Sequence, residues 1–267
     1  NAAECFDLKD RGAIAPGYRG DVVLLDDLKD FHVNRVFIEG ALVAEEGKYL
    51  PEIKKCDISS VKGSVIVKDF SKEKFKMNLK SNKVNVIKIL PGGVVTAKDT
   101  AEIELDANGE FVRNPEVDLV KVAVVERHQG TGNVACGFLK GYGIKEGAVA
   151  LSVAHDSHNI IVVGVNDEEM EFAVNSLIEQ EGGIVLVKEG KVIESMPMPI
   201  AGLMSDQSGE WVDQKLTDIH EKAYEELGIC GDVEPVMTLC FMSLAVIPEI
   251  KLTDMGLFDV TTFSFIP

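Results

Sequence analysis

The chain has 267 residues, of which 46% are hydrophobic and 27% charged, so it can form one or two domains with a sizeable core. Its 44 acidic and 27 basic residues give a net charge of −17, which argues against nucleic acid or an anionic membrane surface as the main partner. The five cysteines are widely spaced and include no C-x-x-C pair, which argues against a disulfide framework or a zinc knuckle and favours a reducing cytoplasm.

The start of the chain indicates that more protein precedes it. Residue 1 is Asn rather than Met, and a short amphipathic piece leads directly to a turn at Ala15-Pro16-Gly17. The opening residues do not follow the basic and then apolar pattern of a secretion signal, and no run of about 18 apolar residues could span a bilayer. We therefore expect a fragment of a longer protein, or a chain cut from a longer precursor.

Residues 1–55 contain only a few strands. An apolar run at 22–25 is followed by runs at 33–38 and 42–43, and the Glu39-Gly40 pair between the last two predicts a hairpin with a two-residue turn. Residues 56–83 are Lys-rich and weakly patterned, which indicates a linker or domain boundary. This stretch could also hold an edge strand at 64–67 and a short amphipathic segment.

From residue 84 to residue 267 the patterns predict a globular domain. Its strands are expected at residues 84–90, 94–97, 101–105, 117–127, 134–142, 148–154 and 160–165. The last two runs are so apolar that we expect both strands to be buried.

Two helices and a hairpin complete this domain. Asn166 can cap the first helix, with Glu169 three residues later as in a capping box, and Gly182 ends it. Ser208 opens the second helix, which stops at Gly228. Between the helices, runs at 183–187 and 192–195 form a hairpin. Strands interleaved with two helices predict an α+β or mixed α/β fold.

The His-rich turn at residues 155–159 is the most prominent candidate site. It lies between two predicted buried strands, so its polar side chains should gather at one end of a sheet, where ligand sites are common. Three interpretations are open. His155, Asp156 and His158 could ligate a metal. Asp156, Ser157 and Asn159 could simply satisfy backbone amides of a tight turn. The third interpretation is a polar pocket wall that donates hydrogen bonds or relays a proton without metal.

A second candidate is the polar segment 126–132, where a predicted strand ends in Glu126-Arg127-His128 and two glycines follow. Glycines let the backbone approach a ligand closely. The segment lacks the order of a phosphate-binding loop, and a surface pair of Arg127 with Glu126 beside a glycine bend explains it equally well. A third segment, the Met-rich, two-proline loop at 196–205, is either a contact surface or a piece packed beneath the core or against a neighbouring domain.

Residues 9–21, Lys9-Asp10-Arg11-Gly12-Ala13-Ile14-Ala15-Pro16-Gly17-Tyr18-Arg19-Gly20-Asp21, resemble the segment that closes an amidohydrolase-superfamily enzyme. In that superfamily it follows the last turn of the (β/α)₈ barrel and enters a small β-sandwich. The resemblance implies that residues 1–55 are the segment after the barrel together with strands of the sandwich.

The rest of the chain is similar to the C-terminal domain of bacterial adenine deaminases. The resemblance covers nearly the whole chain, from residue 1 to about 265. It rests on Val125-Glu126-Arg127-His128, Gly130-Thr131-Gly132-Asn133, Ser152-Val153-Ala154-His155-Asp156-Ser157-His158-Asn159, Pro199-Ile200-Ala201-Gly202-Leu203-Met204-Ser205 and Ile247-Pro248-Glu249-Ile250-Lys251-Leu252-Thr253-Asp254.

The resemblance implies a metal-dependent hydrolase of purine salvage, which deaminates adenine to hypoxanthine and ammonia. In the family, a binuclear manganese or iron site in the barrel activates water. Its ligands include a His-x-His pair, which this sequence lacks. We therefore expect no metal ligands in this chain and no activity of the chain alone. The implied partners are adenine, an N-terminal amidohydrolase barrel and further copies of the chain in a homo-oligomer.

The resemblance places the polar segments near the mouth of the barrel. On that basis, His155, Asp156 and His158 are the predicted catalytic or proton-handling residues, and the predicted substrate-binding residues are Asn159, Arg127, His128 and Glu126. The alternative function is a non-catalytic lid, oligomerisation or scaffold domain of an amidohydrolase. An independent metal-binding protein that uses the His-rich turn is a third hypothesis.

Overall fold

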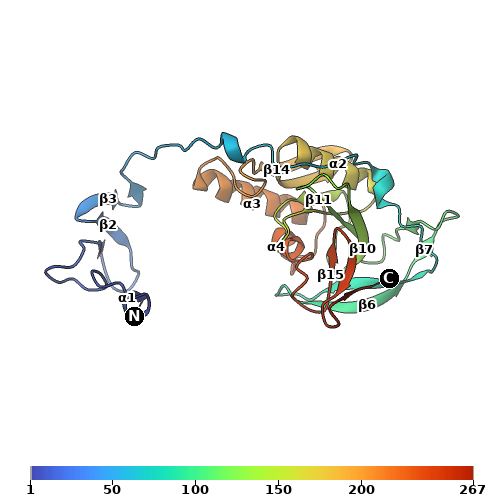
Figure 1. Cartoon of the computed structure of the whole chain (residues 1–267), viewed down its shortest axis with the longest axis horizontal. Helices are drawn as coiled ribbons and strands as arrows, with labels where there is room; N and C mark the ends of the chain where they lie inside the picture. Colours follow the sequence, from blue (N-terminus) through green and yellow to red (C-terminus); the bar gives the residue numbers. More distant parts are fainter. Residues whose placement is uncertain (1, 267) are drawn as a thin grey trace. The chain divides into compact units, whose positions relative to one another are not determined.

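A computed structural model of the chain describes residues 2–266. They divide into a smaller unit that ends at Asp57 and a larger unit that begins at Ile58 (Figure 1). Within residues 2–266, no helix combines the length and the apolar character needed to cross a membrane.

The smaller unit is an antiparallel sheet with a short helix. Its elements are α1 (Ala2–Cys5), β1 (Val22–Leu25), β2 (Val33–Ile38), β3 (Ala41–Glu45) and β4 (Lys48–Tyr49), with the strands in that order across the sheet. The predicted hairpin between β2 and β3 is confirmed. Glu39 and Gly40 both have positive φ, +53° and +79°, as a tight hairpin turn requires. None of the described residues up to 57 is buried.

The first part of the larger unit lies along its surface and forms two short 3₁₀ helices, η1 (Ser59–Val61) and η2 (Lys72–Phe75). The edge strand expected at 64–67 is wrong, because no strand forms there. Ile66 donates its amide to the carbonyl oxygen of Arg127 (2.8 Å), while Val65 and Val67 pack against a hydrophobic cluster. Phe75 is fully buried, so this stretch is anchored by side-chain packing.

An eight-stranded sheet forms the centre of the larger unit. In order across the sheet, its strands are β14 (Lys191–Pro197), β13 (Gly183–Lys188), β11 (Ala148–Leu151), β12 (Ile160–Gly164), β9 (Leu119–Val125), β10 (Val134–Lys140), β5 (Lys83–Ile89) and β6 (Thr96–Glu102). All neighbouring pairs are antiparallel except β10 with β5. The predicted α+β, mixed-sheet class is confirmed, and the described strands form no closed barrel.

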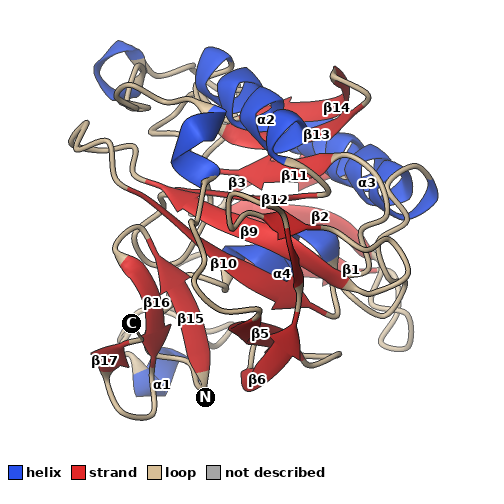
Figure 2. Ribbon diagram, turned by 90° about the vertical axis from the view of Figure 1, so that its right-hand side faces the viewer, coloured by secondary structure: helices blue, strands red, loops and turns tan. Residues whose placement is uncertain are grey.

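Both faces of this sheet are covered, which explains why its central strands are apolar at every position. In β9, Val122 and Val124 belong to one hydrophobic cluster, whereas Ala123 and Val125 belong to another on the opposite face. The buried residues of α2 (Asp167–Glu179) join the second cluster. Those of α3 (Gly209–Glu225) join the first, as do Leu239 and Cys240 of α4 (Pro235–Cys240). Figure 2 shows these helices packed along the strands.

The two predicted helices, α2 and α3, begin where the capping residues place them. The side chain of Asn166 accepts a hydrogen bond from the amide of Glu169 (2.8 Å), and that of Ser208 accepts one from Trp211 (3.3 Å). The second half of the capping box is wrong. The Glu169 carboxylate accepts instead from the amide of Gly190 (3.0 Å), because the turn between β13 and β14 lies beside it.

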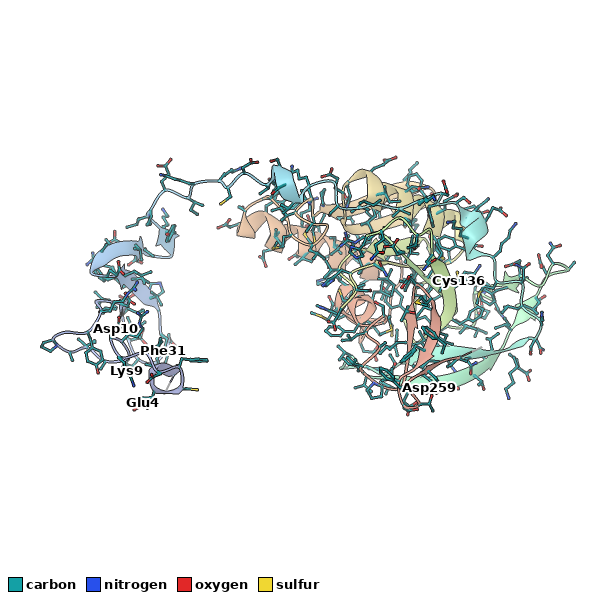
Figure 3. All side chains as sticks on the ribbon, viewed as in Figure 1. Glu4, Lys9, Asp10, Phe31, Cys136 and Asp259 are labelled. Carbon is teal, nitrogen blue, oxygen red and sulfur yellow. The ribbon has the colours of Figure 1, made fainter. Side chains whose placement is uncertain are left out.

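Several elements were not predicted from the sequence. They are α4, β8 (Phe111–Val112), β15 (Ile250–Thr253), β16 (Gly256–Asp259) and β17 (Ser264–Phe265), whereas β7 (Glu104–Leu105) falls within the strand expected at 101–105. Strands β15, β16 and β17 form a small sheet whose Ile250 and Leu252 join the main core. Asp259, labelled in Figure 3, connects this sheet to β6 by accepting from Lys98 Nζ (2.8 Å), and that bond lowers the pKa of its carboxyl.

Candidate functional site

Two of the candidate segments lie side by side at one edge of the large sheet, by which we mean the edge formed by the ends of the central strands β9 and β12. Val125, the last residue of β9, pairs with Ile160, the first residue of β12. The polar segment 126–132 therefore leaves the sheet beside the turn at 155–159 that leads into β12. The prediction that the polar side chains of this turn gather at the end of a sheet is confirmed. The contact between the two segments was not predicted.

The His-rich turn presents several side chains on the surface. Asp156 and Ser157 are exposed, and His155 is half-buried. The ring of His155 lies against those of Phe241 and His158, with centroids 4.8 and 5.3 Å apart. Its amide donates to the carbonyl oxygen of Cys240 (2.8 Å), so the last residue of α4 supports this turn.

His158 is half-buried, like His155. Its backbone has φ +51°, and its amide donates to the carbonyl oxygen of Ala154 (2.6 Å). Nδ1 of its ring is buried and has no hydrogen-bond partner among the described residues. Burial lowers the pKa of His158, and the nearby His155 and Arg127 lower it further. Near pH 7 the ring is therefore neutral, the form that can accept a proton.

Arg127 is the largest fully buried side chain at this edge. Its Nε donates to the carbonyl oxygen of His158 (2.5 Å), and its Nη2 donates to that of Ala201 (3.2 Å). The Arg127 amide donates to Oδ1 of Asn159 (3.4 Å). Burial lowers the pKa of the guanidinium, against the opposing charge of Glu126. Its Nη1 is buried without a partner among the described residues.

Glu126 organises the loop that follows β9. Its carboxylate accepts from the amides of His128 (2.6 Å), Gln129 (2.7 Å) and Thr131 (2.9 Å). Burial alone would raise the pKa of Glu126, but these bonds outweigh it and the pKa lies below its ordinary value. His128 is exposed, and its Nε2 lies 2.7 Å from the carbonyl oxygen of Ser157.

The two-proline loop also meets this edge, through a residue that sequence reasoning missed. Ser152 Oγ donates to the carbonyl oxygen of Gly202 (2.6 Å) and accepts from the amide of Gly183 (2.7 Å). Ser152 stands inside an apolar run, and its partners are 50 and 31 residues away, so no local pattern indicates it. The same holds for Phe241, whose ring contacts His155.

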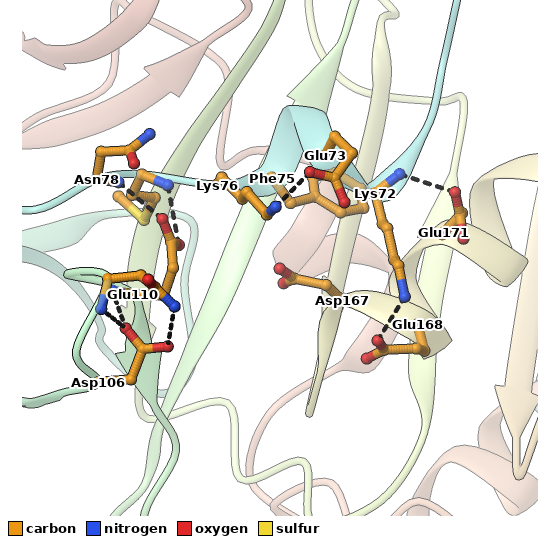
Figure 4. Close-up of polar contacts among 12 residues, drawn as sticks. Lys72, Glu73, Phe75, Lys76, Asn78, Asp106, Glu110, Asp167, Glu168 and Glu171 are labelled. Carbon is orange, nitrogen blue, oxygen red and sulfur yellow. Dashed lines mark hydrogen bonds and ion pairs between the residues drawn. The ribbon is translucent and has the colours of Figure 1, made fainter.

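A cavity of about 510 Å³ lies at the opposite end of β12, beside Gly164 and the first turn of α2. Figure 4 shows polar contacts of residues that line it, including that of Lys72 with Glu168. Several charged side chains of the cavity pair with one another. Lys121 Nζ donates to both carboxylate oxygens of Asp167 (2.7 and 3.0 Å), and Lys72 Nζ donates to Glu168 (2.8 Å). These ion pairs connect η2 and β9 to α2.

Manganese or iron, which the family resemblance implies, finds no suitable ligand set in this part of the protein. Among residues 2–266, no group of three or more His, Cys, Asp or Glu side chains is arranged to hold a metal ion.

Comparison with known proteins identifies the family. The model of the adenine deaminase C-terminal domain family matches residues 93–264. The chain belongs to this family, as the resemblance predicted.

Curated relatives match over the whole chain. It is 67% identical over 266 residues to adenine deaminase 2 of Desulfotalea psychrophila and 48% identical over 266 residues to adenine deaminase of Ligilactobacillus salivarius. Adenine deaminase 2 of Carboxydothermus hydrogenoformans is 46% identical over 267 residues. Each match covers 100% of this chain but only 46% of the relative, so the chain spans about half the length of these proteins.

Proposed function

We propose that this chain is the C-terminal part of an adenine deaminase, a hydrolase that converts adenine to hypoxanthine and ammonia in purine salvage. The observation that carries this proposal is the similarity of the entire chain to proteins named adenine deaminase. An N-terminal amidohydrolase barrel would hold the manganese or iron and bind adenine there. Residues 1–55 would follow that barrel, residues 56–83 would be the boundary, and residues 84–267 would form the accessory domain.

Within this proposal, the edge that carries the His-rich turn faces the substrate site of the barrel. The exposure of Asp156 and His128 and the partial exposure of His155 support this, because these side chains can meet a group that approaches the surface. The neutral ring of His158 supports a role in holding or moving a proton. Glu126 and Asn159, whose side chains are buried, complete this group of polar residues. The unpaired cysteines support a reducing cytoplasm as the location, and assembly into a homo-oligomer remains part of the proposal.

The test is a hybrid protein in which this chain replaces the matching part of the Desulfotalea psychrophila relative. Adenine deamination is followed by ultraviolet absorbance, with manganese or iron present. We expect activity from the hybrid and none from the chain alone. An inactive but folded hybrid would contradict the proposal. If the remaining N-terminal part is as active without the chain, the non-catalytic lid or scaffold function is favoured instead.

Single variants in the hybrid separate a chemical role from a structural one. His155→Gln or His158→Gln should lower kcat by roughly 10²-fold or more, which is the usual contribution of general acid–base catalysis. His220→Gln is the matched control, because that imidazole pairs with Glu234 elsewhere (2.5 Å). Unchanged kcat in both test variants, with normal folding and assembly, would exclude the turn from the reaction.

A further inference from the structure

Three segments that are distant in the sequence converge on the guanidinium of Arg127. Arg127 lies just after β9. Its guanidinium donates one hydrogen bond to the carbonyl oxygen of His158 in the His-rich turn and one to that of Ala201 in the two-proline loop. Arg127 has no exposed surface. The carbonyl groups of two loops thus share one rigid, planar donor that lies between them.

The two-proline loop lies directly on this guanidinium. A Cβ atom added at Gly202 would lie 2.6 Å from Nη1 of Arg127 and 2.9 Å from its Cζ. Gly202 also has φ +71°, a conformation that favours glycine. On its other side the loop is held by the bond from Ser152 to the Gly202 carbonyl oxygen. The close approach leaves no space between the loop and Arg127 for a substrate.

Arg127 does not take part in an ion pair with any described residue. Glu126 is the nearest acid in sequence, but both of its oxygens accept from the following loop, including the hydroxyl of Thr131 (3.1 Å). A buried cation without a carboxylate partner costs free energy, and an apolar side chain of similar volume would avoid that cost. What only arginine supplies here is a pair of directional bonds to two different loops.

We propose that Arg127 is a positioning residue, rather than the substrate contact that the family resemblance implied, and that it locks the His155–Asn159 turn and the Ala201–Gly202 loop into one rigid surface. The bond to His158 fixes the backbone of a residue whose ring is proposed to handle a proton. The effect of this coupling on the reaction rests on the proposed function. The coupling of the two loops itself does not depend on the proposed function.

The coupling is tested on the 267-residue chain itself by hydrogen–deuterium exchange. Arg127→Met should raise the exchange rates of the His158 and Ala201 amides together, by about tenfold or more, because both loops lose their donor. Tyr142→Phe is the matched control. It removes a buried bond to a carbonyl oxygen, that of Pro235 (2.8 Å), away from this edge. Faster exchange in one loop only, or in neither, would overturn the inference.

Arg127→Lys provides a second variant in case the Met variant does not fold. An ammonium group keeps the charge but lacks the planar fork that reaches two carbonyl oxygens at once. We expect faster exchange in at least one of the two loops. Protection of both loops at the parent level would show that the fork is dispensable and would overturn the proposal.

The consequence for the reaction is measured in the active hybrid. Arg127→Lys should lower kcat by about tenfold or more while KM changes less than about twofold, because a misplaced catalytic group affects the transition state more than binding. A raised KM with unchanged kcat would indicate substrate contact and contradict the proposal. Unchanged kcat and KM per folded molecule would contradict it too. An inactive parent hybrid would count against the proposed function, while the exchange result would still decide the coupling.

Discussion

At the scale of single residues, two buried lysines show how differently the same charge is accommodated. Lys121 is paired with both oxygens of Asp167. Lys251 has no exposed surface and donates to the carbonyl oxygen of Val94 (3.0 Å), with no carboxylate bonded to it among the described residues. Burial lowers the pKa of Lys251 to about 8. The folded state therefore disfavours its charged form.

We predict that Lys251→Met raises the free energy of unfolding, and that this gain depends on pH. Below pH 8 the lysine is charged in both states, and the parent bears the full cost of burying it. Between pH 8 and about 10.5 the unfolded chain binds the proton more tightly, so the parent regains stability as the pH rises. A tenfold change in proton affinity corresponds to about 1.4 kcal/mol. The gain in the free energy of unfolding from Lys251→Met should therefore shrink by roughly 3 kcal/mol over this pH range.

Urea unfolding of both proteins at a series of pH values measures this difference. Comparing the variant with its parent cancels the titration of all other groups. A gain that stays constant from pH 7 to pH 10.5 would show that the ammonium of Lys251 is not destabilised by burial.

At the scale of elements, α2 illustrates a helix whose start is set locally. Asn166 caps it, and Asp167, Glu168 and Glu169 place three carboxylates at its positive end. Its four fully buried residues, Met170, Ala173, Val174 and Leu177, recur at helical spacing and face the sheet. Capping, charge and packing therefore all favour the same helix.

We predict that Asn166→Ala lowers the free energy of unfolding by about 1 kcal/mol, because the amide of Glu169 loses its acceptor. Asn166→Asp is the control, since it keeps an oxygen at the same place and should cost much less. Chemical denaturation measures both. Equal losses for the two variants would show that the side-chain oxygen contributes nothing.

At the scale of the whole molecule, burial is unevenly distributed between the two units. Every fully buried side chain of the described residues lies after residue 57, and most of them belong to one continuous core. The sheet of residues 22–49 contains no buried side chain, so it has no hydrophobic core of its own to stabilise it independently.

We predict that residues 58–267, expressed alone, unfold within about 2 °C of the melting temperature of the main transition in the whole chain. The reason is that the larger unit contains the entire core. Scanning calorimetry of both proteins tests this, with circular dichroism to confirm the fold of the shorter one. A large drop in melting temperature would show that the first 57 residues stabilise the larger unit.

Much of the fold was predictable because its signals are local. The hairpin at Glu39-Gly40, the strands around 148–154 and 160–165, and the two helices each follow from side chains a few residues apart. The extended stretch at 64–67 was predicted wrongly, since β propensity cannot tell a paired strand from a segment anchored by side chains such as Phe75.

The sequence by itself determined the family, the mixed fold and the two polar segments of the candidate site, because these depend on short patterns. Only the tertiary structure decided that the segments meet and that Arg127 is buried between them. The bonds from Arg127 to His158 and Ala201 join residues 31 and 74 positions apart. Such pairings come from the order of strands across the sheet, which is set by packing on both faces and leaves no trace in local composition.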